Sequence, residues 1–177
     1  LFGVIGYVLK KLRYPLAPGL KVAIVIPTKN HGDLVRACIE SIERTAGDVV
    51  YEIVLIDHES DDPASLAYFD SLGARVTLLR YSGSFNFAAL NNWAVAQLDG
   101  SHSHYLFCNN DIEAIAPGWL ERMLELGQKP DVGIVGAKLY YPDRKTIQHA
   151  GVVVACCGVA ENLGRFRVTS ENPLDLG

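Results

Sequence analysis

Short apolar runs, separated by segments of helical periodicity, constrain the fold of this sequence more than any other feature. The runs at 21–27 and 51–57 are rich in β-branched residues, which is typical of strands buried on both faces. The runs at 75–80 and 104–109 continue the series. Between them, Asp62-Pro63 is a favourable helix start, and a further helix is expected from about 87 to 98. Strands and helices are therefore expected to alternate from residue 21 onwards.

This alternation predicts a Rossmann-like α/β fold, with a mostly parallel sheet and helices on both faces. Two further strands are expected at 132–141 and 146–155, joined by a turn at 142–144. We place one ligand-binding region at 21–155. In sheets of this kind, ligands bind beyond the carboxyl ends of the strands, so a binding site is expected in the loops at that edge.

The composition fits a globular domain. Of the 177 residues, 49% are hydrophobic and 20% are charged, which suffices for a packed core. The net charge of -4 argues against general nucleic-acid binding, which needs a basic face. The four cysteines, Cys38, Cys108, Cys156 and Cys157, have neither metal-site nor disulfide spacing. We expect them to be buried free thiols in a reducing cytoplasm.

The two ends of the chain differ from this regular part. Residues 1–20 place a short apolar run before a basic cluster, and the run is shorter than the roughly 20 residues of a membrane-spanning helix. We interpret 1–20 as a linker or amphipathic helix whose residues 1–12 contact a membrane surface, at the inner face for a cytoplasmic protein. Residues 156–177 lack periodicity and are expected to be the irregular tail of a truncated domain.

Polar residues follow three of the expected strands at one edge of the sheet. They are Pro27-Thr28-Lys29-Asn30, Asp57-His58-Glu59-Ser60-Asp61 and Asn109-Asn110-Asp111. Neither GxGxxG nor GxxxxGK[ST] is present, which argues against dinucleotide-dependent dehydrogenases and P-loop NTPases. Asp111 is the expected anchor for a divalent cation that would neutralise a bound phosphate.

Taken in order, these segments carry a resemblance. The strings VAIVIPTKN, YEIVLIDHESDD, LRYSGSFNFAALNN, YLFCNNDIEAIAPGWL, VGIVGAKLYYPD and IQHAGVVV resemble the inverting, GT-A-type glycosyltransferases of family 2. IQHAGV resembles the rhamnosyltransferase-like members, and the resemblance covers 21–154. It implies transfer of a UDP- or dTDP-linked sugar to a saccharide acceptor with inversion, in cell-surface polysaccharide synthesis, with Mn²⁺ or Mg²⁺ as cofactor.

The resemblance also implies roles for single residues. It assigns the metal to Asp111. It matches Asp57 to the acid that accepts a hydrogen bond from a uracil or thymine base, whose N3–H is a donor. The other positions matching nucleotide-contacting residues are Pro27, Thr28, Asn30, Ser60, Asn86, Asn91, Asn109 and Asn110.

Several of these residues also have a purely structural interpretation. Asp57 and Ser60 suit the cap of a turn, Asn86 suits a helix N-cap, and 109–111 suits a turn after a strand. His149 is interpreted as a structural residue of a strand, and His102 as part of a solvated loop.

The sequence departs from the family pattern in two ways. Glu59 stands where the family has glycine, which predicts a different loop shape because glycine adopts left-handed turns at least cost. No acidic general-base motif precedes Gly177, so we expect the catalytic base and acceptor pocket beyond this chain, and the chain alone to be inactive. A sheet without its remaining part is expected to self-associate through an exposed apolar edge.

Two alternatives stay open. Sugar-nucleotide pyrophosphorylases share the α/β layout, but they carry a glycine-rich, Arg-containing loop after the first strand, unlike the loop at 27–30. A non-catalytic nucleotide-binding module would keep the fold without the chemistry. An acidic base motif after Gly177 would distinguish an enzyme from such a module.

Overall fold

The computed structural model describes residues 13–154 and 160–168, and the chain divides into two compact units. One unit holds residues 16–124, and the other holds residues 1–15 with 125–177. The boundaries expected from the sequence remain predictions, and the proposed membrane-contacting segment 1–12 lies outside the described residues. No described helix is both long and apolar enough to cross a bilayer.

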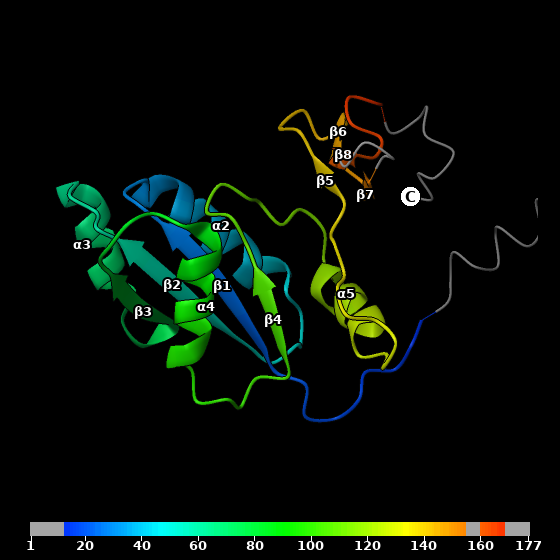
Figure 1. Ribbon diagram of the computed structural model, residues 1–177, viewed down its shortest axis with the longest axis horizontal. Helices are drawn as coiled ribbons and strands as arrows, with labels where there is room; N and C mark the ends of the chain where they lie inside the picture. The colour runs from blue at the N-terminus through cyan, green and yellow to red at the C-terminus, as the bar shows by residue number, and fades with distance from the viewer. Residues whose placement is uncertain (1–12, 155–159, 169–177) are drawn as a thin grey trace, which may run out of the picture. The chain divides into compact units, whose positions relative to one another are not determined.

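The larger unit is built on a four-stranded parallel sheet with the strand order β3-β2-β1-β4 (Figure 1). The strands are β1 (Val22–Thr28), β2 (Tyr51–His58), β3 (Val76–Tyr81) and β4 (His104–Phe107). Their register places Thr28 beside Asp57, and Asp57 beside Arg80. The polar residues that end these strands therefore share one edge, and the predicted α/β fold with a parallel sheet is confirmed.

Helices cover both faces of this sheet, as Figure 1 shows. They are α2 (Gly32–Thr45), α3 (Pro63–Ser71), α4 (Phe87–Gln97) and α5 (Trp119–Gly127), with a 3-10 turn, η1 (Gly73–Arg75), after α3. Side chains alternate along the strands, so Ile24 and Leu55 pack toward α2 and α3. Val25 and Val54 pack toward α4 on the opposite face. Burial on both faces explains the unbroken apolar runs.

The helix starts follow from their capping residues. The Asp62 carboxylate accepts a hydrogen bond from the Ser65 N–H at 2.8 Å, and Pro63 occupies the first turn of α3. The Asn86 side-chain oxygen accepts one from the Ala89 N–H at 2.9 Å at the start of α4. The predicted starts of both helices are confirmed.

The smaller unit holds short antiparallel pairs: β5 (Leu139–Tyr140) with β6 (Ile147–His149), and β7 (Val152–Val154) with β8 (Ala160–Asn162). The two long strands predicted at 132–141 and 146–155 are therefore wrong in extent. The first is a strand only near its end, and the second is interrupted at Gly151, whose φ is 126°. In the described part of the chain, neither pairs with the parallel sheet.

Candidate functional site

A pocket of about 440 Å³ lies at the carboxyl ends of β1, β2 and β4. Four residues predicted to bind nucleotide line it: Pro27, Thr28, Asn109 and Asn110. The remaining lining residues were not among those predicted to bind nucleotide, although Lys29 and His58 belong to the loops expected at this edge. They are Lys29, His31, His58, Phe85, Phe87 and Leu90. The sequence did carry a signal for His58. Successive side chains of a strand point to opposite faces of the sheet, so His58 had to lie on the face opposite to Asp57.

The polar wall of this pocket is fixed by a link between two strand ends. The Asn110 side-chain amide donates to Thr28 Oγ1 at 2.9 Å, and the Thr28 hydroxyl donates to the Asn30 carbonyl at 2.9 Å. The Cys108 N–H donates to the Val25 carbonyl at 3.0 Å, which extends the β1–β4 pairing beyond Phe107. The ends of β1 and β4 are thus held together although 82 residues separate Thr28 from Asn110.

Two buried thiols lie directly behind this wall. The sulfur atoms of Cys38 and Cys108 approach the Asn109 carbonyl oxygen at 3.7 and 3.4 Å. Contact with the Cys38 side chain and burial raise the pKa of the Cys108 thiol far above its usual range. The prediction of buried free thiols is confirmed for these two cysteines, while Cys156 and Cys157 lie outside the described residues.

Asp111 follows Asn110 at the exposed rim of the strand end. Within the described ranges, its carboxylate has neither a hydrogen bond nor an ion pair, and no group of three or more His, Cys, Asp or Glu side chains is placed to hold a metal. One free carboxylate fits a cation that is bound jointly by the protein and a diphosphate, as Mg²⁺ commonly is. The residues present therefore fit a cation delivered with the nucleotide better than a permanently bound one.

Asp57 is 3% exposed and already has two partners. Its carboxylate accepts from the Ser60 N–H at 3.0 Å and from Arg80 Nη1 at 2.8 Å, and Arg80 Nη2 donates to Asp70 at 2.7 Å. The turn-cap interpretation of Asp57 is thus realised. A carboxylate has about four acceptor positions, so these contacts leave capacity for a ligand N–H. The sequence analysis did not predict that Arg80 pairs with Asp57. The position of Arg80 at the end of the third apolar run, beside the end of the second, was the available signal.

Asn30 joins the loops that precede α2 and α3. Its amide oxygen accepts from the Asp61 and Asp62 N–H groups, both at 2.9 Å, and its backbone N–H donates to Ser60 Oγ at 2.7 Å. The helices are linked again where the Gly32 N–H donates to Ser65 Oγ at 2.9 Å. These contacts give Asn30 and Ser60 a structural role in the larger unit.

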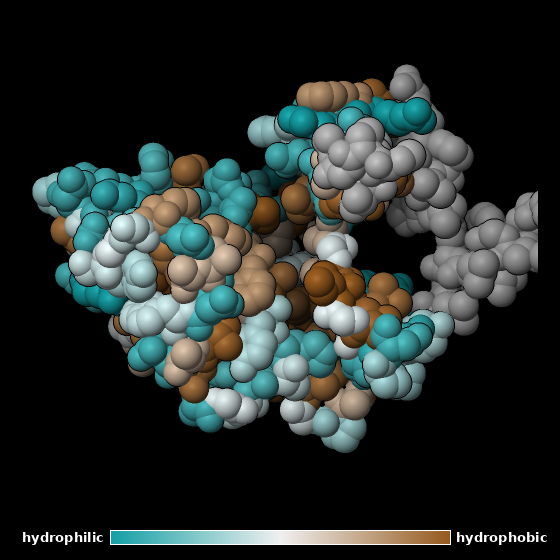
Figure 2. All heavy atoms as spheres, in the orientation of Figure 1, coloured by the Kyte–Doolittle hydropathy of each residue, from teal (hydrophilic) through white to brown (hydrophobic). Residues whose placement is uncertain are grey.

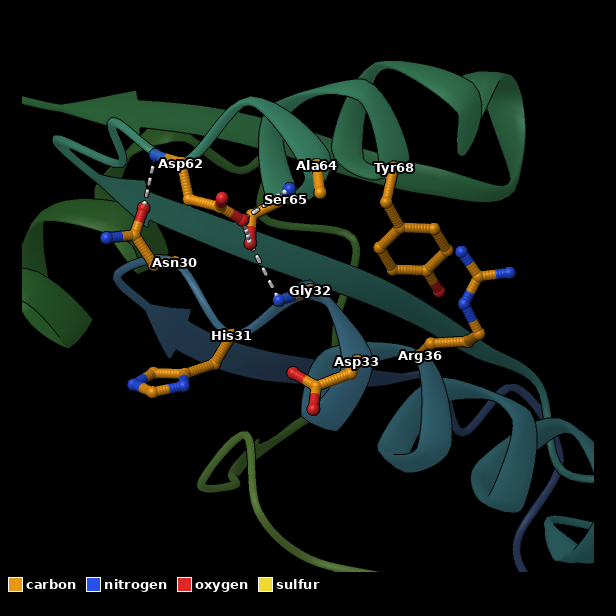
Figure 3. A pocket seen from close by; sticks show the side chains of 9 residues that line it. All are labelled: Asn30, His31, Gly32, Asp33, Arg36, Asp62, Ala64, Ser65 and Tyr68. Carbon is orange, nitrogen blue, oxygen red and sulfur yellow. Dashed lines mark hydrogen bonds between the residues drawn. The ribbon is translucent and has the colours of Figure 1, made fainter.

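The same two loops border a second hollow of about 480 Å³ between the N-terminal ends of α2 and α3 (Figure 3). Asn30, Asp62 and Ser65 lie at one side of it, and the Arg36 guanidinium lies 4.3 Å from the centre of the Tyr68 ring at the other. Of the predicted nucleotide-binding residues, only Asn30 lines this hollow. Asp57 and Ser60 line neither this hollow nor the pocket described above, so the structure does not bring the whole predicted set together.

Asn86 and Asn91 line neither hollow. Asn86 caps α4, as its structural interpretation expected. Asn91 is 4% exposed, its amide N–H donates to the Phe87 carbonyl at 2.8 Å, and its oxygen has no partner among the described residues. Contact of these two side chains with a nucleotide stays a prediction.

Glu59 adopts the left-handed backbone conformation, with a φ of 55°. The loop thus keeps the conformation that favours glycine, although the residue is Glu. The Ser82 hydroxyl donates to the Glu59 carboxylate at 2.7 Å and is the main cause that lowers the pKa of this carboxyl group. Glu59 therefore combines a left-handed backbone, which is unusual for a residue other than glycine, with a surface hydrogen bond to Ser82.

The expectation for His102 was wrong. Its ring is buried, and its Nε2 lies 3.0 Å from the Glu52 carboxylate at the amino-terminal edge of the sheet. The polar residues around it in the sequence suggested a solvated loop, but the pairing with Glu52 is non-local. His149 bonds to the Asn162 side chain at 2.9 Å, in keeping with a structural role.

Comparison with known proteins identifies the family. Residues 23–153 match the family described as Glycosyl transferase family 2. The chain belongs to this family. The protein y4gI of Sinorhizobium fredii is 43% identical over 150 residues, and the O-antigen biosynthesis protein RfbC of Myxococcus xanthus is 37% identical over 151. These matches cover 83% and 85% of the chain but only 16% and 12% of the relatives, so this family 2 domain spans a small part of their length.

A solved structure shares the fold. The mannosyltransferase from Pyrobaculum calidifontis, in complex with GDP-Man and Mn²⁺, superposes with a TM-score of 0.52 at 19% identity. The superposition covers 75% of this chain and 40% of the mannosyltransferase. The fold of the family 2 domain is therefore GT-A-like.

Proposed function

We propose that this family 2 domain binds the nucleotide-diphosphate sugar donor of an inverting glycosyltransferase. The family match over residues 23–153 carries the proposal, because it includes every residue that lines the pocket at the ends of β1, β2 and β4. The donor is a UDP- or dTDP-linked sugar and the acceptor is a saccharide. The O-antigen role in the name of the Myxococcus relative supports cell-surface polysaccharide synthesis, and the IQHAGV segment supports a rhamnosyltransferase-like member of the family.

Within this proposal, the nucleotide lies across the carboxyl edge of the sheet. Asp57 accepts the N3–H of the base, and Arg80 holds the Asp57 carboxylate in place. The diphosphate lies toward 109–111, where Asp111 would hold Mn²⁺ or Mg²⁺. When bound, the cation offsets negative charge on the departing diphosphate. The Mn²⁺ held together with GDP-Man in the mannosyltransferase is compatible with this arrangement.

Transfer also needs a carboxylate that takes the proton of the acceptor hydroxyl. We propose that this base lies in a part of the protein after Gly177, which agrees with the much greater length of the relatives. The chain then binds the donor without catalysing transfer. For the whole protein, we propose the cytoplasm as the location, at the inner face of the membrane.

Calorimetry tests this proposal directly. UDP and dTDP are titrated into the chain with and without Mn²⁺, and into Asp111→Ala. We expect binding that depends on the metal and is weakened at least tenfold by Asp111→Ala. Asp48→Ala is the matched control, because Asp48 is an exposed acid before the start of β2, at the opposite edge of the sheet. Binding that is independent of the metal and of Asp111 would contradict the assigned metal site.

A non-catalytic nucleotide-binding module is the second candidate. Such a module would keep the fold and the pocket at the ends of β1, β2 and β4 without the chemistry. Sugar transfer by a longer polypeptide that continues past Gly177 would exclude the module.

A further inference from the structure

Two phenylalanine side chains stand exposed beside the capping residue of α4. Phe85 is 69% exposed and Phe87 is 44% exposed, and both line the pocket at the carboxyl edge of the sheet. Hydrophobic residues also reach the surface over α4 in the space-filling view (Figure 2). A single exposed apolar side chain needs no explanation, but two in one concave site mark a surface suited to a ligand.

Helix capping does not account for Phe85. It occupies the position before the N-cap Asn86, and Leu90 lies four residues after that cap, which is the spacing of a hydrophobic staple. A staple buries the first of its two residues against the second. Leu90 is fully buried, whereas most of the Phe85 surface is open to solvent. The greater part of the Phe85 ring is therefore free to contact a ligand.

The Phe85 ring nevertheless packs against other aromatic rings. It lies 5.7 Å from the ring of His58, centre to centre, and the His58 ring lies 5.8 Å from that of Tyr81. The Tyr81 ring in turn meets Trp93 of α4 edge-on at 5.1 Å. His58 Nε2 also bonds the Gly83 carbonyl at 2.8 Å, which fixes the loop that carries Phe85. A series of buried and partly buried rings thus supports an exposed one.

The lining of the pocket also has a polar part. Asn109, Asn110 and Thr28 belong to it, and the Asn110 side-chain amide donates to the Thr28 hydroxyl. Apolar rings and hydrogen-bonding groups around one pocket suit a flat ring whose faces are apolar and whose edge carries oxygen or nitrogen atoms. A nucleobase has this chemistry, and so does a sugar ring through its C–H face.

We propose that Phe85 and Phe87 are ligand-contacting residues that stack against a ring of the bound sugar nucleotide. This inference rests on the proposed function and names the part of the donor that the pocket recognises. The ring comes from one of two sources, the base or the transferred sugar, and both present the same apolar face to the two phenylalanines. The test separates them.

The test measures binding of pyrophosphate, UDP and UDP-glucose, each with Mn²⁺, to the wild-type chain and to the double variant Phe85→Ala, Phe87→Ala. We expect pyrophosphate to bind both proteins equally, because it has no ring. We expect UDP binding to weaken about 5- to 150-fold if the base is stacked, as removal of one base-stacking aromatic usually causes. A loss confined to UDP-glucose would assign the stacked ring to the sugar.

Two further variants complete the test. The double variant Phe85→Tyr, Phe87→Tyr keeps both rings and is expected to bind as the wild type does. Tyr105→Ala removes another exposed ring, which lies on β4 away from the pocket lining, and is expected to change nothing. Equal binding of all three ligands to the alanine double variant would overturn the inference, and so would an equal loss for pyrophosphate. If the wild-type chain binds none of the ligands, both the proposed function and this inference fail.

Discussion

Glu59 holds a backbone conformation that costs a residue with a side chain about 1–3 kcal/mol. We predict that Glu59→Gly changes the free energy of unfolding by less than about 1 kcal/mol, because relief of this strain offsets the lost Ser82 hydrogen bond and the greater chain entropy of glycine. Glu59→Val is expected to destabilise the fold by more than about 1 kcal/mol, since β-branched residues disfavour this region most. Urea denaturation at pH 7 measures both, and Glu59→Ala isolates the hydrogen bond. A neutral valine variant would contradict the prediction.

Single residues were predictable from sequence when their role is local. Asn86 and Asp62 act within three residues of their own positions, so their caps could be expected from residue type and spacing. The Asn30 contacts with the loop at 60–62 and the burial of His102 against Glu52 could not, because these partners are about 30 and 50 residues distant in sequence. Asp57 lies between these cases, since its cap is local and its Arg80 partner is not.

Among the elements, the strands of the parallel sheet were predictable from the sequence, whereas the extent of the short strands β5 to β8 was not. A strand buried on both faces needs an unbroken apolar run, and β1 and β2 have one. The segment at 132–141 is also apolar, but it contains Gly133 and Gly136, which weaken a strand. A strand moreover exists only with a partner, and an apolar run does not specify which strand it will pair with. The extent of β5 to β8 was therefore beyond the sequence pattern.

The start of β2 is joined to the loop before β4 through Glu52. Its carboxylate accepts from the Thr77 hydroxyl at 2.7 Å, and it lies 3.0 Å from the His102 ring and 3.3 Å from the Lys21 ammonium. The Thr77 hydrogen bond, then Lys21 and His102, lower the pKa of Glu52 below its ordinary value of 4.5, against the opposing effect of burial. A carboxyl group with a lower pKa in the folded state stabilises the fold above pH 4.5, and this contribution is lost as the pH falls through the folded-state pKa.

We therefore predict that Glu52→Gln reduces the loss of stability on acidification. Urea denaturation of the wild type and of this variant between about pH 7 and pH 3 should show the difference mainly below pH 4.5, the ordinary pKa of this carboxyl group. Glu40→Gln, at an exposed position of α2, serves as the matched control and should follow the wild-type curve. Parallel curves for the wild type and Glu52→Gln would show that Glu52 contributes nothing to the pH dependence.

At the scale of the whole molecule, the family match spans 23–153, whereas the compact unit that contains the pocket ends at residue 124. The sheet of that unit has β4 at one side, and among the described residues β4 pairs only with β1. Two large side chains of β4, Tyr105 and Phe107, are 39% and 49% exposed on the face that α4 covers elsewhere. An unpaired strand edge beside exposed apolar side chains is a site where chains tend to associate.

We predict that this polypeptide self-associates through β4. Light scattering over a range of concentrations should show an average mass that rises with concentration. Phe107→Lys should restore the monomer, because a charge on an edge strand opposes pairing with a second copy. Val50→Lys is the matched control, since Val50 is 60% exposed and lies just before β2, away from that edge. If association persists in Phe107→Lys but is lost in Val50→Lys, another surface joins the copies; a monomer at every concentration would mean that the β4 edge is not a site of association in this chain.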